Sequence, residues 1–365
     1  MYLQKLALTN FKNYSQTEYS FSDKINCFVG NNGVGKTNLL DAIYYLSFCK
    51  SYFNPIDSQN IRHNEEFFVI HGTFIRNDET QVLVQCTQKK EHRKKFMCNK
   101  KEYDRLADHI GQFPLVMISP YDSDLINDGS EARRKYTDSV ISQFNKVYLD
   151  DLINYQKALF HRNVLLKFFA EHQVFRPEEL EIWDEQLVRL GERIYNERKD
   201  FLEKFIPIFR KYFSIISSSP ENSVDIIYQS HLSGNSFSNL LKESLSRDRA
   251  AQFTTTGIHK DDLDFRISGY PVKKFGSQGQ QKSFVVAIKL AQFEFTKNSK
   301  GFKPILLLDD IFDKLDDRKV EQLIRLVGEN NFGQVFITDT SPERIRNIFS
   351  SLDIDHKIFT LLNGF

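Results

Sequence analysis

The segment with the clearest chemistry is a glycine-rich loop, Gly30-Asn31-Asn32-Gly33-Val34-Gly35-Lys36-Thr37. It fits the pattern G-x-x-x-x-G-K-[ST], in which the glycines let consecutive backbone N–H groups point at phosphate oxygens. In such a loop the lysine, here Lys36, reaches the β- and γ-phosphates of a nucleotide, and the hydroxyl of Thr37 binds Mg²⁺. The loop therefore predicts a site for a nucleotide and Mg²⁺.

Two adjacent carboxylates, Asp309 and Asp310, follow the apolar run Ile305–Leu308. Such a run predicts a strand buried on both faces of a parallel sheet, and ligands bind at the carboxyl ends of such strands. We expect Asp309 to lie on the Mg²⁺ side of the site and Asp310 to orient or deprotonate an attacking water. Together with the glycine-rich loop, this pair predicts an ATPase.

A third segment, Ser277-Gln278-Gly279-Gln280-Gln281, directly precedes a helical run over 284–295. A small, glycine-bearing turn at a helix N-terminus is a second device for binding anions. The same residues also fit an ordinary N-terminal helix cap, so the segment alone leaves both interpretations open. Lys314-Leu315-Asp316 follows the carboxylate pair, and the order of all these motifs along the chain is informative.

A basic segment over 88–105 could meet the phosphates of DNA. It contains eight bases against three acids, with Phe96 and Tyr103 between them. The candidate DNA-contacting residues are Lys89, Lys90, Arg93, Lys94, Lys95, Lys100 and Lys101. A solvated hairpin explains the same charges equally well, and this alternative stays open. Arg133, Arg134 and Lys135 form a smaller candidate patch.

Alternating and apolar runs indicate the elements that must position these motifs. A buried strand is expected to end at Val29, directly before the glycine-rich loop, and the apolar residues over 38–46 have the spacing of a helix. Further strands are expected at 67–70, 82–84, 115–118, 224–228 and 334–337, and a helix at 237–245. The pattern predicts an α/β fold of the P-loop type.

The middle of the chain has a helical period instead. Apolar residues from Ser139 to Leu159 fall in steps of three and four, and those from Leu180 to Phe205 form a near-heptad seam. A turn over 173–177 lies between the two runs. We expect an antiparallel helical hairpin that splits the ATPase fold, an arm of about 30 residues per helix and roughly 45 Å in length.

These patterns divide the chain into three parts. An N-terminal ATPase lobe with the glycine-rich loop is expected over 1–128, and a helical arm domain over 129–250. A C-terminal ATPase lobe with the Ser277 segment and the carboxylate pair is expected over 251–365.

The composition is that of an ordinary folded protein. Of the 365 residues 41% are hydrophobic and 27% charged, and the net charge of +1 excludes a histone-like polycation. The four cysteines include no C-x-x-C pair, and no run approaches the ~20 apolar residues of a membrane span. We expect a cytoplasmic protein without a disulfide framework, a structural zinc or a membrane partner.

Over nearly its full length the chain resembles the RecF family of ABC-type ATPase heads, which are related to the SMC proteins. The resemblance rests on Asn10-Phe11-Lys12-Asn13-Tyr14, the glycine-rich loop with the helix after it, Ile118-Ser119-Pro120, Gly257-Ile258-His259-Lys260-Asp261-Asp262-Leu263, the Ser277 segment, Leu307-Leu308-Asp309-Asp310 and Leu315-Asp316. The Gly257 and Ser277 segments are much more specific than the glycine-rich loop.

The resemblance implies an ATP-dependent homodimer with an ABC-type fold. In such a dimer the residues Ser277, Gln278, Gly279 and Gln280 of one subunit close on the ATP held by the other subunit. The resemblance also implies binding to single-stranded and gapped DNA in repair, together with RecO and RecR, to place RecA, with roles in replication and the SOS response. For His259 and Lys260 we expect a hydrogen-bonded strut rather than a DNA contact.

Two features predict slow hydrolysis, with ATP acting mainly as a dimerising switch, and we expect DNA to stimulate this ATPase. Asp310 is one methylene shorter than the glutamate of most ABC ATPases, although RecF-like proteins carry an Asp–Asp pair. Thr338-Asp339-Thr340 stands where transporter ATPases place a switch histidine.

Three other classes of protein compete with this interpretation. The missing histidine and the helical arm argue against a transporter ATPase. A cohesin-like structural protein would need a much longer coiled coil. Another SMC-like ATPase, for example in phage defence, is the alternative that stays open.

Overall fold

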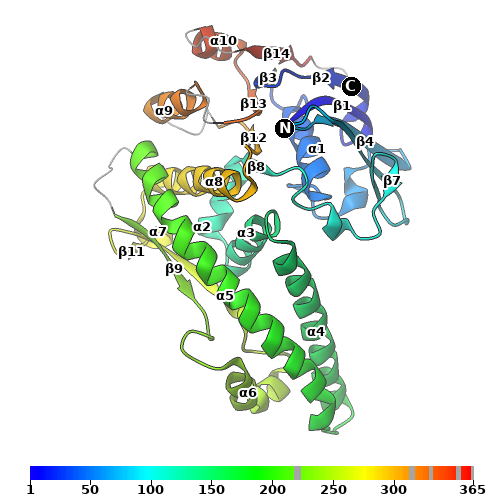
Figure 1. Cartoon of the computed structure of the whole chain (residues 1–365), viewed down its shortest axis with the longest axis vertical. Helices are drawn as coiled ribbons and strands as arrows, with labels where there is room; N and C mark the ends of the chain where they lie inside the picture. The colour runs from blue at the N-terminus through cyan, green and yellow to red at the C-terminus, as the bar shows by residue number, and fades with distance from the viewer. Residues whose placement is uncertain (218–222, 312–316, 329–331, 351–354, 363–365) are drawn as a thin grey trace. The chain divides into compact units, whose positions relative to one another are not determined.

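The computed structural model of the chain describes residues 1–217, 223–311, 317–328, 332–350 and 355–362. The chain divides into two compact units, whose elements are labelled in Figure 1. Unit 1 consists of Met1–Ser123, Tyr212–Pro220 and Lys282–Phe365, and unit 2 of Asp124–Lys211 and Glu221–Gln281. The Lys314-Leu315-Asp316 motif lies outside the described residues.

Unit 1 contains a five-stranded sheet in the order β14-β3-β13-β12-β8, and every neighbouring pair is parallel. The strands are β3 (Ile25–Val29), β8 (Leu115–Ile118), β12 (Ile305–Leu308), β13 (Val335–Asp339) and β14 (His356–Thr360). All but the edge strand β14 are buried along their whole length. This confirms the buried parallel strand expected at 305–308, because a run that is apolar on both faces needs cover on both sides.

A second sheet of unit 1 is antiparallel, in the order β2-β1-β4-β5-β6-β7. Its strands are β1 (Tyr2–Phe11), β2 (Tyr14–Ser20), β4 (Phe67–Ile75), β5 (Gln81–Lys89), β6 (Lys95–Cys98) and β7 (Lys101–Glu102). Buried and exposed residues alternate along β4 and β5, so one face of this sheet meets the core and the other meets water.

Helix α1 (Lys36–Phe48) joins the two sheets, because its apolar residues share one core with strands of both. The other helical segments of unit 1 are η1 (Asp57–Asn60), η2 (Leu106–Asp108), η3 (Pro120–Ser123), α9 (Asp317–Gly328) and α10 (Pro342–Ser350). Helix α8 (Gln278–Lys300) begins in unit 2 and continues in unit 1. The helices expected at 38–46 and 284–295 are therefore confirmed, and both are longer than the pattern indicated.

Unit 2 is built mainly from long helices and a small antiparallel sheet in the order β11-β10-β9. Its elements are α2 (Asp124–Asn127), α3 (Ser130–Ser142), α4 (Lys146–Glu171), α5 (Pro177–Ile216), β9 (Val224–Gln229), α6 (Phe237–Ala251), η4 (Ile258–Lys260), β10 (Asp262–Ile267), β11 (Tyr270–Pro271) and α7 (Val272–Phe275). The last residues of α5 belong to unit 1.

Helices α4 and α5 form the expected antiparallel hairpin, visible in Figure 1. Three contacts fix its register: Asn145 Nδ2 donates to Glu197 at 3.0 Å, Arg193 pairs with Asp151 at 3.1 Å, and Arg162 pairs with Asp184 at 2.5 Å. As the residue number rises along α4, the partner's number falls along α5.

The first helical run differs from the expectation in one respect. The continuous run from Ser139 to Leu159 is broken between α3 and α4, where Asn145 becomes the N-cap and its side chain accepts a hydrogen bond from the Tyr148 N–H at 3.0 Å. The apolar spacing continues across this break, so the period alone does not reveal it.

The three-part division at 128/129 and 250/251 stays a prediction. In the two compact units, residues 251–281 group with the helical hairpin rather than with the last part of the chain. Within the described ranges, no helix is both long enough and apolar enough to cross a lipid bilayer.

A buried arginine on α5 ties several parts of unit 2 together. The Arg198 guanidinium is 2% exposed. It pairs with Asp138 of α3 and Asp261 of the Gly257 segment, each at 2.9 Å, and donates to the Ile258 carbonyl, also at 2.9 Å. A buried charge that keeps all its partners is tolerated, but one that loses its counter-charge is costly.

We expect Arg198→Ala to lower the free energy of unfolding by about 3 to 5 kcal/mol, because it leaves two carboxylates without their cation. Arg193→Ala is the matched control on the same helix. Arg193 also pairs with an aspartate, but its side chain is 52% exposed, so the loss should stay below about 1 kcal/mol. Urea denaturation followed by circular dichroism measures the free energy of unfolding of both variants. Equal losses in the two variants would contradict the structural role given to Arg198.

Candidate functional site

The glycine-rich loop lies between the end of β3 and the start of α1. Gly33 and Gly35 have φ angles of 84° and 103°, in the left-handed region that glycine adopts freely. A Cβ on Gly35 would lie 2.4 Å from Asn13 Nδ2 and 2.8 Å from the Tyr14 hydroxyl. Only glycine therefore fits at position 35.

The loop presents donors that the protein leaves unused. Helix α1 has no side-chain cap at its N-terminus. The backbone N–H groups of residues 31–35 donate to no protein acceptor within the part of the chain that the structure describes. The Lys36 ammonium donates to the carbonyls of Gly30 and Asn31 at 2.8 and 3.0 Å, and so lies across the same loop. Uncapped N–H groups beside an ammonium fit a chain of phosphates.

Residues at the turn between β1 and β2 brace the loop from outside. Asn13 Nδ2 donates to the Val34 carbonyl at 3.2 Å, and the Tyr14 hydroxyl donates to the Gly35 carbonyl at 3.1 Å. Asn38 on α1 donates in turn to Asn13 Oδ1 at 2.7 Å. The sequence resemblance includes Asn13 and Tyr14 but gives them no role, since their contacts with the loop form only in the folded protein.

The carboxylate pair lies beside the loop, at the carboxyl end of β12. The Thr37 hydroxyl donates to Asp309 Oδ1 at 2.9 Å, and so does the Thr338 hydroxyl, also at 2.9 Å. Thr338 in addition accepts the Asp310 N–H at 2.8 Å. The structure thus brings Lys36, Thr37 and both carboxylates together and adds Thr338, whose contribution the sequence did not reveal.

The two carboxylates have different surroundings. Asp309 is 2% exposed, and burial raises its pKa to about 6, while the hydrogen bonds from Thr37 and Thr338 lower it and the nearby Asp310 raises it. Asp310 is partly exposed and has a φ of 43°, an unusual value for a residue other than glycine. Backbone strain of this kind persists where the surrounding structure holds it in place.

The donor set fits Mg²⁺ bound together with a nucleotide. Mg²⁺ prefers oxygen ligands and is usually held by one or two protein groups, waters and substrate phosphates. Thr37 Oγ1 and Asp309 Oδ1 are two such oxygens within 2.9 Å of each other. A buried carboxylate with a raised pKa is also a group whose charge a cation would stabilise.

The Ser277 segment belongs to unit 2, whereas the loop and the carboxylates belong to unit 1. Ser277 caps α8 in a reciprocal arrangement: its N–H donates to Gln280 Oε1 at 2.8 Å, and its hydroxyl accepts the Gln280 N–H at 3.2 Å. This is a capping box. The cap interpretation is therefore correct as local structure, and the exposed Ser277, Gln278 and Gly279 stay accessible to an anion.

His259 forms the expected strut. Its Nδ1 lies 2.9 Å from the Tyr155 hydroxyl and its Nε2 lies 3.0 Å from the Thr254 carbonyl, so both ring nitrogens are engaged within unit 2. Because a carbonyl only accepts, Nε2 carries the proton and Nδ1 accepts from Tyr155. Lys260 is exposed, and its ammonium lies 5.0 Å from the centre of the Phe253 ring.

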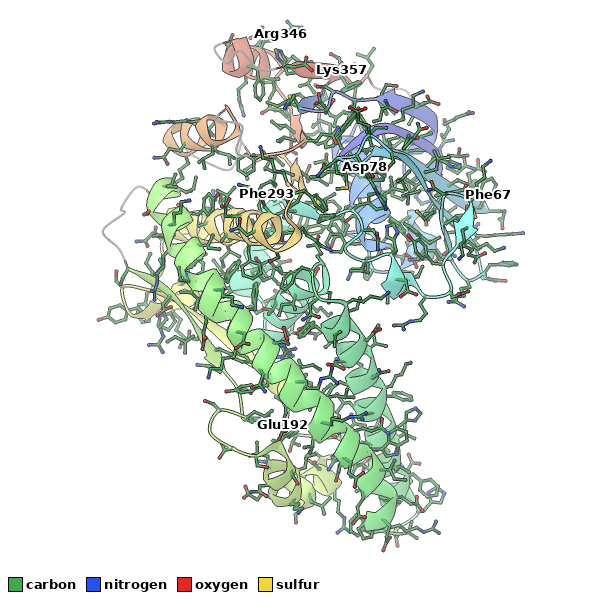
Figure 2. The ribbon with its side chains drawn as sticks, viewed as in Figure 1. Phe67, Asp78, Glu192, Phe293, Arg346 and Lys357 are labelled. Carbon is green, nitrogen blue, oxygen red and sulfur yellow. The ribbon has the colours of Figure 1, made fainter. Side chains whose placement is uncertain are left out.

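Most of the basic segment over 88–105 is exposed on the edge of the antiparallel sheet. The exposed candidates are Lys89, Lys90, Arg93, Lys95, Lys100 and Lys101. Phe67, labelled in Figure 2, lies opposite Lys89 in the β4–β5 register and is 39% exposed. Lys89 therefore lies beside an exposed aromatic ring of the neighbouring strand.

Lys94 has a different environment from its neighbours. Its side chain is 9% exposed, and its ammonium pairs with Asp57 at 2.7 Å and donates to the Cys49 carbonyl at 2.5 Å. Because these internal partners satisfy its charge, we leave Lys94 out of the proposed DNA-contacting set.

In the smaller patch at residues 133–135, the two arginines also have internal partners, and Lys135 forms a pair on its own helix. Arg133 pairs with Asp262 at 2.7 Å, Arg134 donates to the Asp261 carbonyl at 2.6 Å, and Lys135 pairs with Glu131 at 2.6 Å. The two arginines hold the Gly257 segment on α3 and are structural, whereas the side chain of Lys135 is 75% exposed and stays accessible.

Comparison with known families gives one match over most of the chain. The model of the family described as RecF/RecN/SMC N terminal domain matches residues 2–357. A protein of Flavobacterium johnsoniae named DNA replication and repair protein RecF is 54% identical over 99% of this chain and 100% of its own length. A protein of the same name from Bacteroides fragilis strain YCH46 is 50% identical over 100% of this chain and 97% of its own.

Solved structures agree with this match. One described as the recombination mediator protein RecF with ATP in the RecFOR pathway is 31% identical with a TM-score of 0.90, covering 100% of this chain and 96% of that one. An Smc head domain with a coiled coil from Pyrococcus yayanosii is 14% identical with a TM-score of 0.59, covering 98% and 94%, and shares the fold alone. The fold is thus that of an ABC-type ATPase head of the SMC kind, as the sequence predicted.

The hydrogen-bonded imidazole of His259 predicts that the free energy of unfolding depends on pH. Burial lowers the pKa of His259 from 6.5 to about 4. Between these values the unfolded chain takes up a proton that the folded one refuses, so stability falls as the pH falls, by up to about 3 kcal/mol at the lower end. His259→Gln should remove this contribution, because glutamine does not titrate.

The measurement is urea denaturation at several values between about pH 7 and about pH 4.5. His92→Gln, at an exposed histidine, is the control and should keep the wild-type slope. An unchanged pH slope in His259→Gln would show that the imidazole is not held neutral.

Proposed function

This chain belongs to the RecF family of SMC-type ATPases, and on that basis we propose that it is an ATP-dependent DNA-binding protein of recombinational repair at single-strand gaps. One observation carries the proposal more than any other: Thr37 after β3 and Asp309 after β12 meet at 2.9 Å beside the glycine-rich loop. The proposed cofactors are ATP and Mg²⁺. The RecF name of full-length relatives favours this role over phage defence.

Each residue of the site has a separate task in this proposal. The loop N–H groups and the Lys36 ammonium bind the phosphates of ATP, and Thr37 and Asp309 would hold Mg²⁺, which supplies positive charge against the β- and γ-phosphates. Asp310 orients the attacking water and accepts its proton. Thr338 keeps both carboxylates in position through its bonds to Asp309 and to the Asp310 N–H.

The proposed active form is a homodimer with two composite sites. Each chain carries one glycine-rich loop and one Ser277 segment, and Ser277, Gln278 and Gly279 are exposed. In this form Ser277, Gln278, Gly279 and Gln280 of one subunit meet the ATP bound to the partner subunit. ATP then joins two heads, and hydrolysis separates them.

We further propose that hydrolysis is slow and that DNA stimulates it. The Asp310 side chain is short, and its backbone is held at a φ of 43°. Thr338 lies near the end of β13, at the place where transporter ATPases carry the histidine that assists ATP hydrolysis. A hydroxyl holds neighbouring groups in place but does not exchange protons near neutral pH as an imidazole does.

DNA and protein partners complete the proposal. The exposed bases at the β5–β7 edge suit phosphates, and a single-strand gap offers both duplex and single-stranded DNA. A related protein described as a recombination mediator of the RecFOR pathway supports RecO and RecR as partners, with RecA placed on the strand afterwards.

Replacing the proposed base should separate ATP binding from hydrolysis. Asp310→Asn keeps the size of the side chain but removes the proton acceptor, so hydrolysis should fall by about 10²-fold or more. Light scattering should still detect the dimer with ATP, and it should last longer than in the wild type. Lys36→Ala is the control, which should lose both dimerisation and hydrolysis. Wild-type hydrolysis in Asp310→Asn, or wild-type turnover well above about 10 s⁻¹, would contradict the proposal.

Reversing charge on the basic edge should weaken binding to duplex DNA. Lys95→Glu with Lys101→Glu removes up to two phosphate contacts, and the slope of log K against log salt concentration should become shallower by about 1.8. Lys157→Glu with Lys167→Glu makes the same change of charge on α4 and serves as the control. Fluorescence anisotropy measures the slopes, and equal slopes in the two double variants would show that this edge makes no contact.

A further inference from the structure

A pocket of about 650 Å³ lies at the edge of unit 1 opposite the glycine-rich loop. Three of its lining residues lie just before parallel strands: Lys24 before β3, Lys303 two residues before β12, and Gln334 before β13. The loop and the carboxylates follow the other ends of β3 and β12. The five residues of β3 span about 16 Å, which is the least distance between the two sites.

A second hollow of about 430 Å³ adjoins the first and shares Met1, Asn77 and Phe302 with it. It adds Arg76 and Asp78 from the turn between β4 and β5, and Lys300 from the end of α8. Asp78 is labelled in Figure 2. The two hollows together form one concave surface built from the strand starts of both sheets.

This surface carries an excess of positive charge. Its cations are Lys24, Arg76, Lys297, Lys300 and Lys303, and its acids are Asp23 and Asp78. The Asp78 carboxylate already accepts hydrogen bonds from the Thr80 hydroxyl at 2.6 Å and the Thr80 N–H at 3.1 Å. Lys297 also pairs with Glu294 of its own helix at 3.6 Å, yet among the described residues that line the hollows the cations still outnumber the acids.

The lysines are close enough to repel one another. Burial lowers the pKa of Lys303, and the charges of Lys297 and Lys24 lower it further. Burial also lowers the pKa of Lys300. An anion in the pocket would relieve both the repulsion and the cost of burial.

Helix electrostatics explain only part of this cluster. Lys297 and Lys300 lie in the last turn of α8, where cations interact favourably with the carbonyl end of a helix. Lys24, Arg76 and Lys303 come from three other segments that have no such reason to converge. Lys24 and Lys303 line the first hollow and Arg76 lines the adjoining one, and this gathering of cations from separate segments is the feature from which we infer a ligand.

We propose that this pocket binds phosphate groups, either those of a single-stranded nucleic acid or those of a free polyphosphate. Lysine ammonium groups bind phosphates as point charges, and Asn77 and Asn298 add amide donors. A concave site admits a flexible strand, whereas a duplex presents its phosphates on a convex surface.

The test uses the full chain and a fluorescein-labelled oligothymidylate of about 12 nucleotides, with a non-hydrolysable ATP analogue and Mg²⁺ occupying the nucleotide loop. Lys24→Glu with Lys297→Glu should weaken binding about tenfold and make the salt slope shallower by about 1.4. The control is again Lys157→Glu with Lys167→Glu. The loss should add to that of Lys95→Glu with Lys101→Glu, because neither Lys95 nor Lys101 lines the two hollows.

Inorganic tripolyphosphate separates the two sources of phosphate. Calorimetric binding of tripolyphosphate that Lys24→Glu with Lys297→Glu weakens, with oligothymidylate binding unchanged, assigns the pocket to free polyphosphate. Weakening of both assigns it to nucleic acid as well. The proposal of a phosphate site is wrong if the double substitution changes the affinity for neither ligand, or if the control variant loses as much affinity. It is also wrong if polyglutamate competes as well as tripolyphosphate.

Discussion

The candidate site depends on one constraint: parallel strands that share a sheet end at the same edge. β3 and β12 lie far apart in the sequence and are separated in the sheet by β13, yet Thr37 and Asp309 meet at 2.9 Å. The middle strand contributes the connecting group, because Thr338 bonds to Asp309 and to the Asp310 N–H. The register of three strands therefore sets the distance between the phosphate-binding loop and the carboxylates. The long insertion between them is tolerated because it enters and leaves the sheet without altering that register.

In unit 2 the register between α4 and α5 must be fixed by other means, because an apolar seam between two helices permits one helix to slide by a turn along the other. Two buried arginines remove that freedom. Arg162 is fully buried and pairs with Asp184 of α5 at 2.5 Å and Asp248 of α6 at 2.7 Å, while Arg198 pairs with Asp138 and Asp261. The Arg162–Asp184 pair is satisfied in one register of α4 and α5 only, because any slip would leave a buried charge without its partner. The Arg198 pairs fix α5 in the same way against α3 and the Gly257 segment. We infer that these pairs specify the alignment of the hairpin more than they add to its stability.

Local patterns were sufficient for most of the architecture and for the chemistry of the nucleotide site. The loop, the Ile305–Leu308 strand and the α4–α5 hairpin follow from glycine spacing, apolar runs and helical period, all of which act over a few residues. The brace from Asn13 and Tyr14 could not be predicted in this way, because it depends on a contact between segments that only the fold brings together. Lys94 has the same charge as its neighbours, and only its burial against Asp57 shows that it is structural. At Asn145 the apolar period runs through a helix break that a side-chain cap creates.

The net charge of +1 also hides a separation that only the fold reveals. One edge of the parallel sheet holds Asp309 and Asp310, and burial raises the pKa of Asp309. The opposite edge holds Lys24, Lys297 and Lys303, where burial and mutual repulsion lower the pKa of Lys303. The edges are about 16 Å apart along β3, too far for a direct ion pair between them, so neither edge neutralises the other. In the two proposals made above, an ion from solution would relieve each edge: a divalent cation beside the aspartates and phosphate groups beside the lysines. Overall neutrality is therefore compatible with two strongly charged sites of opposite sign in one folded unit.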